Sequence, residues 1–181
     1  MISELFLMAD IHEECFDVVD NADQVVSQLT RSEVHRRKLL HRAVHVFLFR
    51  SDMAMLIHKR SDTKEEFPSV WTSSCSGHVS AGEDYDATAV RELHEELGVE
   101  SVVERLQKFA ACPDTSHEFT VLYQCISDAA VTPDPGEIAE VQWMSVDKIR
   151  LWMEQAPEDF SPAFCLLFRW FLQNSKTPGS H

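Results

Sequence analysis

Apolar and polar residues alternate along the chain in patterns that predict a mixture of strands and helices. Runs of β-branched and aromatic residues indicate strands at 16–20, 42–49, 54–58, 70–79, 106–112, 119–126 and 141–144. Charged or amphipathic stretches indicate helices at 31–40, 84–97, 146–155 and 162–172. Polar or proline-rich stretches at 61–68 and 132–136 are typical of loops, and a turn at Ser51 and Asp52 predicts a hairpin.

The stretch 84–97 carries the clearest local signals for a helix. Its predicted apolar face, at about 100° per residue, consists of Ala87, Val90, Leu93, His94 and Leu97. The opposite face holds Arg91 and three glutamates, Glu92, Glu95 and Glu96. Asp84 suits the N-cap position, and Gly98 lies just past the end, where a left-handed cap is expected.

The three glutamates have two interpretations from the residues alone. Clustered charges usually form a solvated helix surface. Here, however, like charges at i,i+4 repel each other by about 0.3 kcal/mol per pair, and no lysine lies among them. A hard cation such as Mg²⁺ prefers carboxylate oxygens and shares its remaining positions with water and phosphate, so the same face also suits metal binding.

Length and composition favour a single globular domain. The chain has 181 residues, 44% of them hydrophobic, so we expect one domain over 1–181, with a core at about 41–174 and an N-terminal extension at 1–40. No apolar run approaches the roughly 18 residues of a membrane span, so no membrane partner is expected. Five scattered cysteines, an odd number, favour a reduced, cytoplasmic location.

The net charge limits the partners that the chain can bind. At −14 it argues against a nucleic acid polymer held through its phosphates. An acidic protein that binds a small anionic diphosphate needs a cation to reverse the local charge. The segment before Arg31 either covers the active site or mediates dimerisation, so a homodimer stays open.

Residues 77–99 follow the pattern G-x5-E-x7-R-E-U-x-E-E-x-G-U, where U is aliphatic. Seven identities at fixed spacing would arise by chance about once in a billion positions. This pattern resembles the signature of the Nudix hydrolase family without a departure. The resemblance implies an α/β (α+β) fold, namely an α/β/α sandwich with a mixed β-sheet, and hydrolysis of a diphosphate bond in a nucleoside diphosphate, nucleoside triphosphate or related X-linked diphosphate.

The same resemblance implies roles for individual residues. Glu92, Glu95 and Glu96 would be ligands of Mg²⁺ or Mn²⁺ and central to catalysis. Glu83 and Arg91 would hold the motif together, with Glu83 reaching the metal in some members. Gly77 would allow close approach of the backbone to the metal.

A second resemblance extends over roughly residues 35–172 and points to the isopentenyl diphosphate isomerase branch of the superfamily. The residues that carry it include Leu40 to Ala43, Lys59-Arg60, Lys64, Phe67-Pro68, Trp71-Thr72, Ser76 to His78, Gln142-Trp143 and Phe160 to Pro162. By this resemblance His41, His78 and Glu118 would be metal ligands, and His35 a further one with a one-residue register difference. Imidazole and carboxylate ligands together suit Zn²⁺ or Mn²⁺.

Each of these matches also has a structural interpretation. Arg60 and Lys64 match diphosphate contacts of the isomerases, but two cations in a loop can be ordinary surface charges. Isolated histidines are commonly structural or surface residues. Trp71 and Trp143 are expected to anchor the core rather than to stack on a substrate.

One departure from the isomerases favours hydrolysis. They carry an essential cysteine immediately before the Gly-His pair, where this chain has Ser76, a weaker proton donor. Cys75 is adjacent, but neighbouring residues of a strand point to opposite faces. Isomerisation with an unexpected proton donor and a non-catalytic diphosphate sensor stay as alternatives. Three residues are candidates for the general base, namely Glu118, Glu137 and Glu92.

Overall fold

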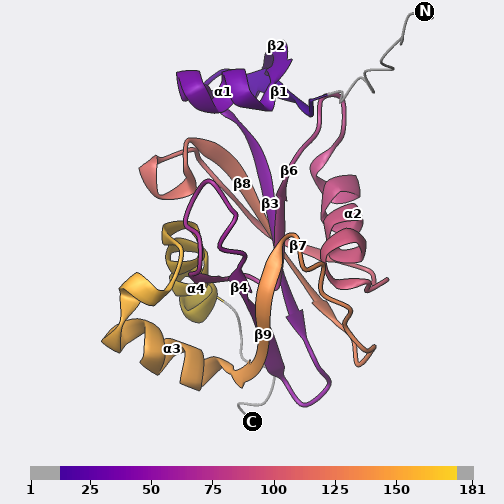
Figure 1. Cartoon of the computed structure of the whole chain (residues 1–181), viewed down its shortest axis with the longest axis vertical. Helices are drawn as coiled ribbons and strands as arrows, with labels where there is room; N and C mark the ends of the chain where they lie inside the picture. The colour runs from indigo at the N-terminus through magenta and orange to yellow at the C-terminus, as the bar shows by residue number, and fades with distance from the viewer. Residues whose placement is uncertain (1–12, 175–181) are drawn as a thin grey trace, which may run out of the picture.

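The computed structural model describes residues 13–174, and its centre is one seven-stranded mixed sheet (Figure 1). Its strands are β3 (His41–Phe49), β4 (Ala54–Arg60), β5 (Trp71–Thr72), β6 (Cys75–His78), β7 (Glu104–Phe109), β8 (Glu118–Ile126) and β9 (Ile138–Ser145). The main order is β5-β4-β3-β8-β7, with β6 on β3 and β9 on β4. Strands β3 and β8 run parallel, whereas the other pairs are antiparallel.

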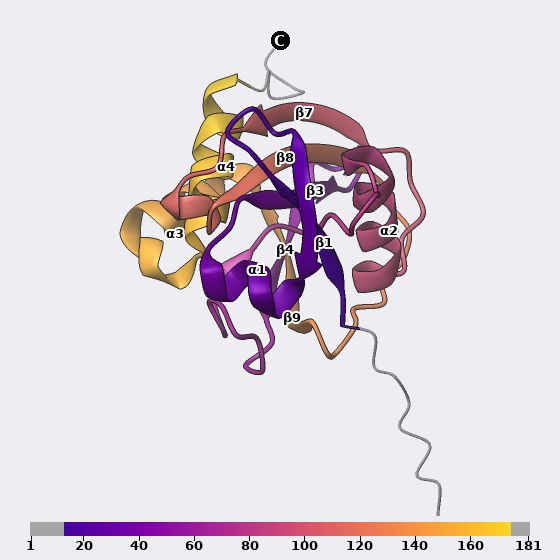
Figure 2. The ribbon, with the colours of Figure 1, turned by 90° about the horizontal axis from the view of Figure 1, so that it is seen from above.

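Helices cover both faces of this sheet, which confirms the predicted sandwich (Figures 1 and 2). On one face, α2 (Tyr85–Leu97) packs through Leu93 and Leu97 on Val44 and Val46 of β3. On the other face lie α3 (Val146–Gln155) and α4 (Pro162–Asn174). Alternate residues of β3 thus enter two different cores, as the period of a strand requires.

The predicted hairpin of β3 and β4 forms, but its pairing is short. The two strands pair at Phe49 and Met55, after which β6 takes the edge of β3 through Ala43–Val46. Strand β4 pairs instead with β9 over its whole length. This divergence leaves the start of β3 beside β6, where the candidate site lies.

An N-terminal hairpin packs on one end of the sheet, at the top of Figure 1. It consists of β1 (Cys15–Val19) and β2 (Val25–Thr30), followed by α1 (Arg31–Arg37). Strand β2 was not predicted, because its residues are exposed or half-buried and lack an alternating pattern. The buried Asp23 ties the hairpin to the domain by accepting hydrogen bonds from Arg42 Nε at 2.6 Å and from Tyr85 at 3.0 Å, and it pairs with Lys108.

Helix α2 begins and ends as predicted, but its buried face was predicted wrongly. The Asp84 side chain accepts a hydrogen bond from the Ala87 N–H at 2.8 Å, and Gly98 is left-handed with φ of 65°. The predicted apolar face included Ala87, Val90 and His94, which are exposed. The buried side instead includes Glu92 and Glu96, because the helix turns these two carboxylates toward the sheet.

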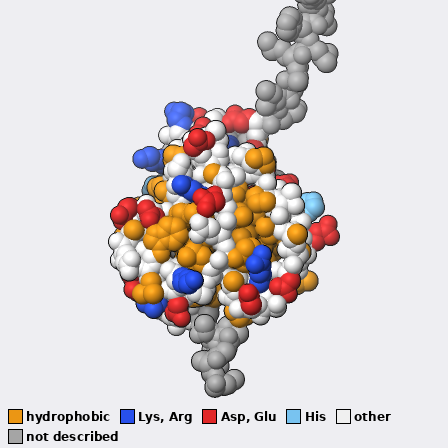
Figure 3. Space-filling model, turned by 60° about the horizontal axis from the view of Figure 1, so that its bottom comes forward, with side chains coloured by type: hydrophobic (Ala, Val, Ile, Leu, Met, Phe, Trp, Pro, Cys, Tyr) orange, Lys and Arg blue, Asp and Glu red, His pale blue; other side chains and the backbone are white. Residues whose placement is uncertain are grey.

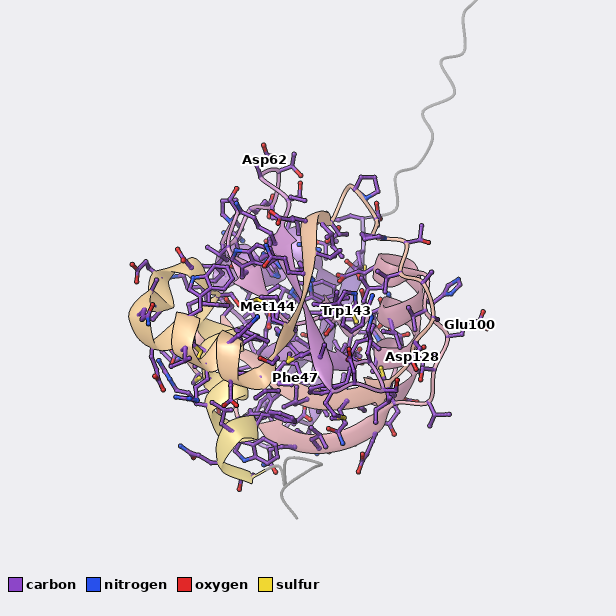
Figure 4. All side chains as sticks on the ribbon, turned by 90° about the horizontal axis from the view of Figure 1, so that it is seen from below. Phe47, Asp62, Glu100, Asp128, Trp143 and Met144 are labelled. Atoms are coloured by element: carbon purple, nitrogen blue, oxygen red, sulfur yellow. The ribbon has the colours of Figure 1, made fainter. Side chains whose placement is uncertain are left out.

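The two tryptophans lie in the hydrophobic packing, as predicted. Trp71 is 7% exposed and contacts Trp152 edge to face at 5.5 Å between ring centroids. Trp143 on β9 packs against the core on the α2 side, and the Arg50 guanidinium covers it at 4.0 Å from its ring centroid. Trp143 and Met144 lie on opposite sides of β9 in the view from below (Figure 4). Hydrophobic side chains gather over this end of the molecule between scattered charges (Figure 3).

Among residues 13–174, no helix has the length and apolar character needed to cross a membrane.

Candidate active site

Most of the candidate residues meet in one cavity of about 310 Å³. It is lined by parts of β3, β6, α2, the loop after β4 and the N-terminal segment. The predicted residues that line it are His35, Arg60, Lys64, Gly77, His78, Arg91, Glu92, Glu95, Glu96, Glu118 and Glu137. His41 instead lines a neighbouring pocket that shares His35, and Glu83 lies behind Arg91.

Gly77 is needed because the Glu92 carboxylate lies directly against it. A Cβ atom at residue 77 would lie 2.0 Å from Glu92 Cδ. Glycine therefore lets the helix α2 and strand β6 approach so closely that Glu92 enters the cavity. The sequence resemblance ascribed this close approach to the metal, whereas in the structure the group that needs the space is the glutamate.

Arg91 holds the carboxylates of the motif in place. Its guanidinium donates to Glu83 at 3.0 and 2.9 Å, to Glu92 at 2.7 Å and to Glu95 at 2.9 Å. A fourth group, the carbonyl of His78, accepts from Nη2 at 3.3 Å. Arg91 thereby connects the helix to strand β6 and to the loop that carries Glu83.

The buried glutamates are electrostatically unfavourable without a cation. Burial raises the pKa of Glu92 to about 7, although Arg91 opposes the shift. Burial raises the pKa of Glu96, and repulsion from Glu92 and Glu137 raises it further. Glu95 is more exposed and pairs with Arg91. Clustered carboxylate oxygens with raised pKa values fit a hard divalent cation, which would stabilise their charged forms.

A second cluster consists of three histidines. His35 of α1, His41 of β3 and His78 of β6 each offer a ring nitrogen, and these atoms lie within 4.8 Å of one another. Glu118 Oε1 lies 3.0 Å from His78 Nε2 and 3.4 Å from His41 Nε2. Burial would raise the pKa of Glu118, but its interactions with His41 and His78 lower it below its usual range.

Two nitrogens in this cluster are buried without a hydrogen bond, namely Nε2 of His35 and Nε2 of His41. The other ring nitrogen of His41, Nδ1, lies 2.9 Å from the Leu39 carbonyl and donates to it. That bond leaves a lone pair on Nε2, which is the usual arrangement of a metal-binding histidine. The residues therefore fit a second divalent cation.

The cationic residues lie at the end of β4 and in the loop that follows it. The Arg60 guanidinium donates to the carbonyls of Glu66 at 3.1 Å and Phe67 at 3.2 Å, and burial lowers its pKa. Lys64 forms an ion pair with Glu137. Both cations line the cavity together with the acidic residues.

Cys75 and Ser76 point to opposite faces of β6, as predicted. Cys75 is fully buried among the residues that pack on α2, and burial raises the pKa of its thiol well above the usual value. Ser76 lines the cavity, and its backbone N–H donates to Glu96 Oε2 at 3.3 Å.

Sequence reasoning missed several residues of the cavity. His45 lies on the same face of β3 as His41 and Ala43, so alternation along this strand was a signal that could have identified it. Thr72 and Ser161 also line the cavity and share a hydrogen bond of 2.9 Å. Glu14 and Arg31 enter from the N-terminal segment, and no local pattern indicates them.

Comparisons with known proteins find relatives that cover most of the chain. The family model described as the NUDIX domain matches residues 39–164. An isopentenyl-diphosphate Delta-isomerase of Serratia proteamaculans is 30% identical over 174 residues, which cover 93% of each chain. One from Nocardia farcinica is 31% identical and covers 81% of this chain and 87% of its own. The crystal structure of DR0079 from Deinococcus radiodurans matches with a TM-score of 0.77 at 30% identity, covering 87% of this chain and 98% of that one.

Proposed function

Because the chain belongs to the Nudix domain family, we propose that it is a metal-dependent hydrolase of a diphosphate bond. The substrate would be a nucleoside diphosphate, a nucleoside triphosphate or a related X-linked diphosphate. The observation that carries this proposal is that Glu92, Glu95 and Glu96 of the motif line one cavity that also holds Arg60 and Lys64. One site thus combines carboxylates that can bind a metal ion with an arginine and a lysine that can bind phosphate oxygens.

Glu92, Glu95 and Glu96 would hold Mg²⁺ or Mn²⁺, and the histidine cluster with Glu118 would hold a second divalent cation such as Zn²⁺. When bound, these ions supply positive charge for the phosphate oxygens and acidify the attacking water. Arg60 and Lys64 bind the diphosphate and orient it. Arg91 keeps Glu92 and Glu95 in position through its hydrogen bonds.

Glu137 is the best candidate for the general base. Of the three candidates, Glu92 and Glu118 belong to the two groups of metal ligands, whereas Glu137 contacts Lys64. A base needs a free carboxylate oxygen within reach of the attacking water. Glu137 would take the proton of that water while the bridging P–O bond breaks.

The glutamate motif can be tested by a matched pair of variants. We expect Glu96→Gln to lower turnover by at least about 100-fold, as removal of a charged catalytic group does. The melting temperature of the metal-free protein should not fall, because the substitution removes a buried charge. Glu100→Gln is the control, because Glu100 is an exposed glutamate just beyond the same helix (Figure 4). Equal turnover in the two variants would contradict a hydrolase that uses this motif.

Isomerisation of isopentenyl diphosphate is the second candidate. The names of the relatives and the cluster of His35, His41, His78 and Glu118 favour it. Ser76 at the position of the isomerases' cysteine opposes it. If the native chain is a hydrolase, it should not move the double bond, and Ser76→Cys is the variant expected to gain that activity. Isomerisation by the native chain, measured by proton NMR, would favour the alternative.

The cysteines also support a location for this activity. All five lie among the described residues and none is in a disulfide. Free thiols persist in a reducing compartment, so we place the enzyme in the cytoplasm.

A further inference from the structure

His45 occupies a part of the cavity that neither the glutamate motif nor the histidine cluster uses. It lies four residues along β3 from His41, on the same face, or about 13 Å at the rise of a strand. Its neighbour across the β3–β6 pair is Ser76, whose N–H contacts Glu96. His45 thus lines the cavity beside Ser76, separate from the ring nitrogens of the histidine cluster.

The hydrogen bond of His45 determines which ring nitrogen carries its proton. Nδ1 lies 2.6 Å from the Ser73 hydroxyl, and Ser73 is fully buried. That contact is the one hydrogen bond of the Ser73 hydroxyl among residues 13–174. If the hydroxyl accepted from Nδ1, its own proton would be buried without a partner, which is unfavourable. Ser73 therefore donates to Nδ1, and the proton of the imidazole lies on Nε2.

Nε2 is then a fixed donor that faces the cavity. No hydrogen bond joins it to any of the residues that the structure describes, and it is not among the nitrogens shut off from solvent. Burial lowers the pKa of His45 to about 4, so the ring is neutral near pH 7 and offers one N–H rather than a positive charge.

The groups around His45 include both charged and uncharged polar side chains. Besides burial, Glu118 raises the pKa of His45 and Arg60 lowers it, so both charges act on the ring. Thr72 and Ser161, which share a hydrogen bond of 2.9 Å, line the same cavity with Ser76 and Ala163. Phe67 is the one aromatic hydrocarbon side chain among the described residues that line the cavity, and it is 41% exposed. A hydrocarbon group would meet hydroxyls and an N–H here, whereas a group with oxygen acceptors would satisfy them.

We propose that His45, oriented by Ser73, is a specificity-determining residue that donates a hydrogen bond from Nε2 to an oxygen acceptor in the organic part of the substrate. The inference rests on the proposed function, because it assumes that the cavity binds a diphosphate. It narrows the substrate class to diphosphates with a sugar or base, and it disfavours alkenyl diphosphates. A bound alkenyl group leaves the Nε2–H without an acceptor, which costs affinity.

Three types of ligand distinguish a contact to the organic part of the substrate from contacts to the diphosphate alone. Calorimetry with Ca²⁺ as the cation would measure dissociation constants for the four common ribonucleoside diphosphates, isopentenyl diphosphate and methyl diphosphate. We expect at least one nucleoside diphosphate to bind about 10- to 100-fold more tightly than isopentenyl diphosphate, the range expected for an unpaired donor. Methyl diphosphate lacks the acceptor and reports on the diphosphate contacts alone.

The variants test the donor itself. His45→Leu keeps a similar volume without a donor, so it should abolish the preference and leave the affinity for methyl diphosphate unchanged. His45→Gln restores an N–H and should recover most of the preference. Ser73→Ala leaves the imidazole ring in place but removes the hydrogen bond that keeps its proton on Nε2. This variant should therefore weaken the preference by an intermediate factor. It also tests the inference if His45→Leu does not fold.

Two results would overturn the inference. One is a wild-type affinity for isopentenyl diphosphate equal to or above that for every nucleoside diphosphate. The other is a preference that survives both His45→Leu and Ser73→Ala. Phosphorus NMR of the same mixtures with Mg²⁺ separates the two proposals, because selective binding without cleavage would refute the hydrolase and leave the role of His45 standing.

Discussion

Gly77→Ala is the smallest change that should disable the site. The added methyl group would lie 2.0 Å from Glu92 Cδ and 2.1 Å from Oε1. Since carbon atoms in ordinary contact are at least about 3.5 Å apart, the carboxylate must retreat by about 1.5 Å. The backbone at residue 77 is not left-handed, so alanine fits it without strain.

The expected loss follows from this displacement. Misplacing a catalytic group by about 1 Å can cost about 100-fold in rate, equivalent to about 2.7 kcal/mol of activation free energy. We therefore expect kcat/KM to fall by at least about 100-fold and the affinity for Mg²⁺ to weaken. The hydrophobic core is untouched, so the melting temperature should change by less than about 4 °C.

The assay compares Gly77→Ala with Gly136→Ala, the same substitution where the nearest atom to the new Cβ would be 3.3 Å away. Turnover of a nucleoside diphosphate panel is followed by phosphate release, and folding by thermal melting. Wild-type turnover in Gly77→Ala would refute the placement of Glu92 against this glycine.

Three further changes test other parts of the structure. Glu137→Gln should lower kcat by about 100-fold or more with little change in KM, if Glu137 is the base; an unchanged kcat would exclude it. Asp23→Asn should lower the free energy of unfolding in urea by about 2–3 kcal/mol. The pKa of Asp23 is lowered, because its hydrogen bonds with Lys108, Arg42 and Tyr85 outweigh burial. The stability that Asp23 contributes is therefore present above a pH of about 4 and is lost as the pH falls further. If Asp23→Asn were as sensitive to acid as the wild type, this explanation would be contradicted. Zn²⁺ should raise the melting temperature of the wild type but not of His35→Ala, and an equal rise in both would argue against the histidine site.

Local signals were sufficient to predict helix α2 and its caps, because Asp84 and Gly98 act within one turn of the helix ends. The buried face of that helix was not predictable in the same way. Glu92 is buried against Gly77 of a neighbouring strand, and Glu96 accepts a hydrogen bond from the Ser76 N–H of the same strand. The amphipathic pattern of a helix contains no such information. The pattern placed these glutamates opposite the apolar face, whereas tertiary contacts turn Glu92 and Glu96 toward the sheet.

The site was predictable where a motif or a resemblance connected distant residues. The resemblance grouped His35, His41, His78 and Glu118 as ligands, and the structure brings these four residues together, with His35 coming from α1. Arg31 lines the same cavity without any pattern that marks it. Its position depends on how the N-terminal hairpin packs on the sheet, which is a long-range property of the fold.

The most direct test of the central claim is phosphorus and proton NMR of the purified protein with Mg²⁺ and separate samples of nucleoside diphosphates, nucleoside triphosphates and isopentenyl diphosphate. A hydrolase with the geometry of Glu92, Glu95 and Glu96 predicts new phosphate or pyrophosphate signals from a nucleotide and an unchanged alkene spectrum. A shifted alkene proton pattern with the diphosphate intact, and no cleavage of any nucleotide, would contradict the proposed function.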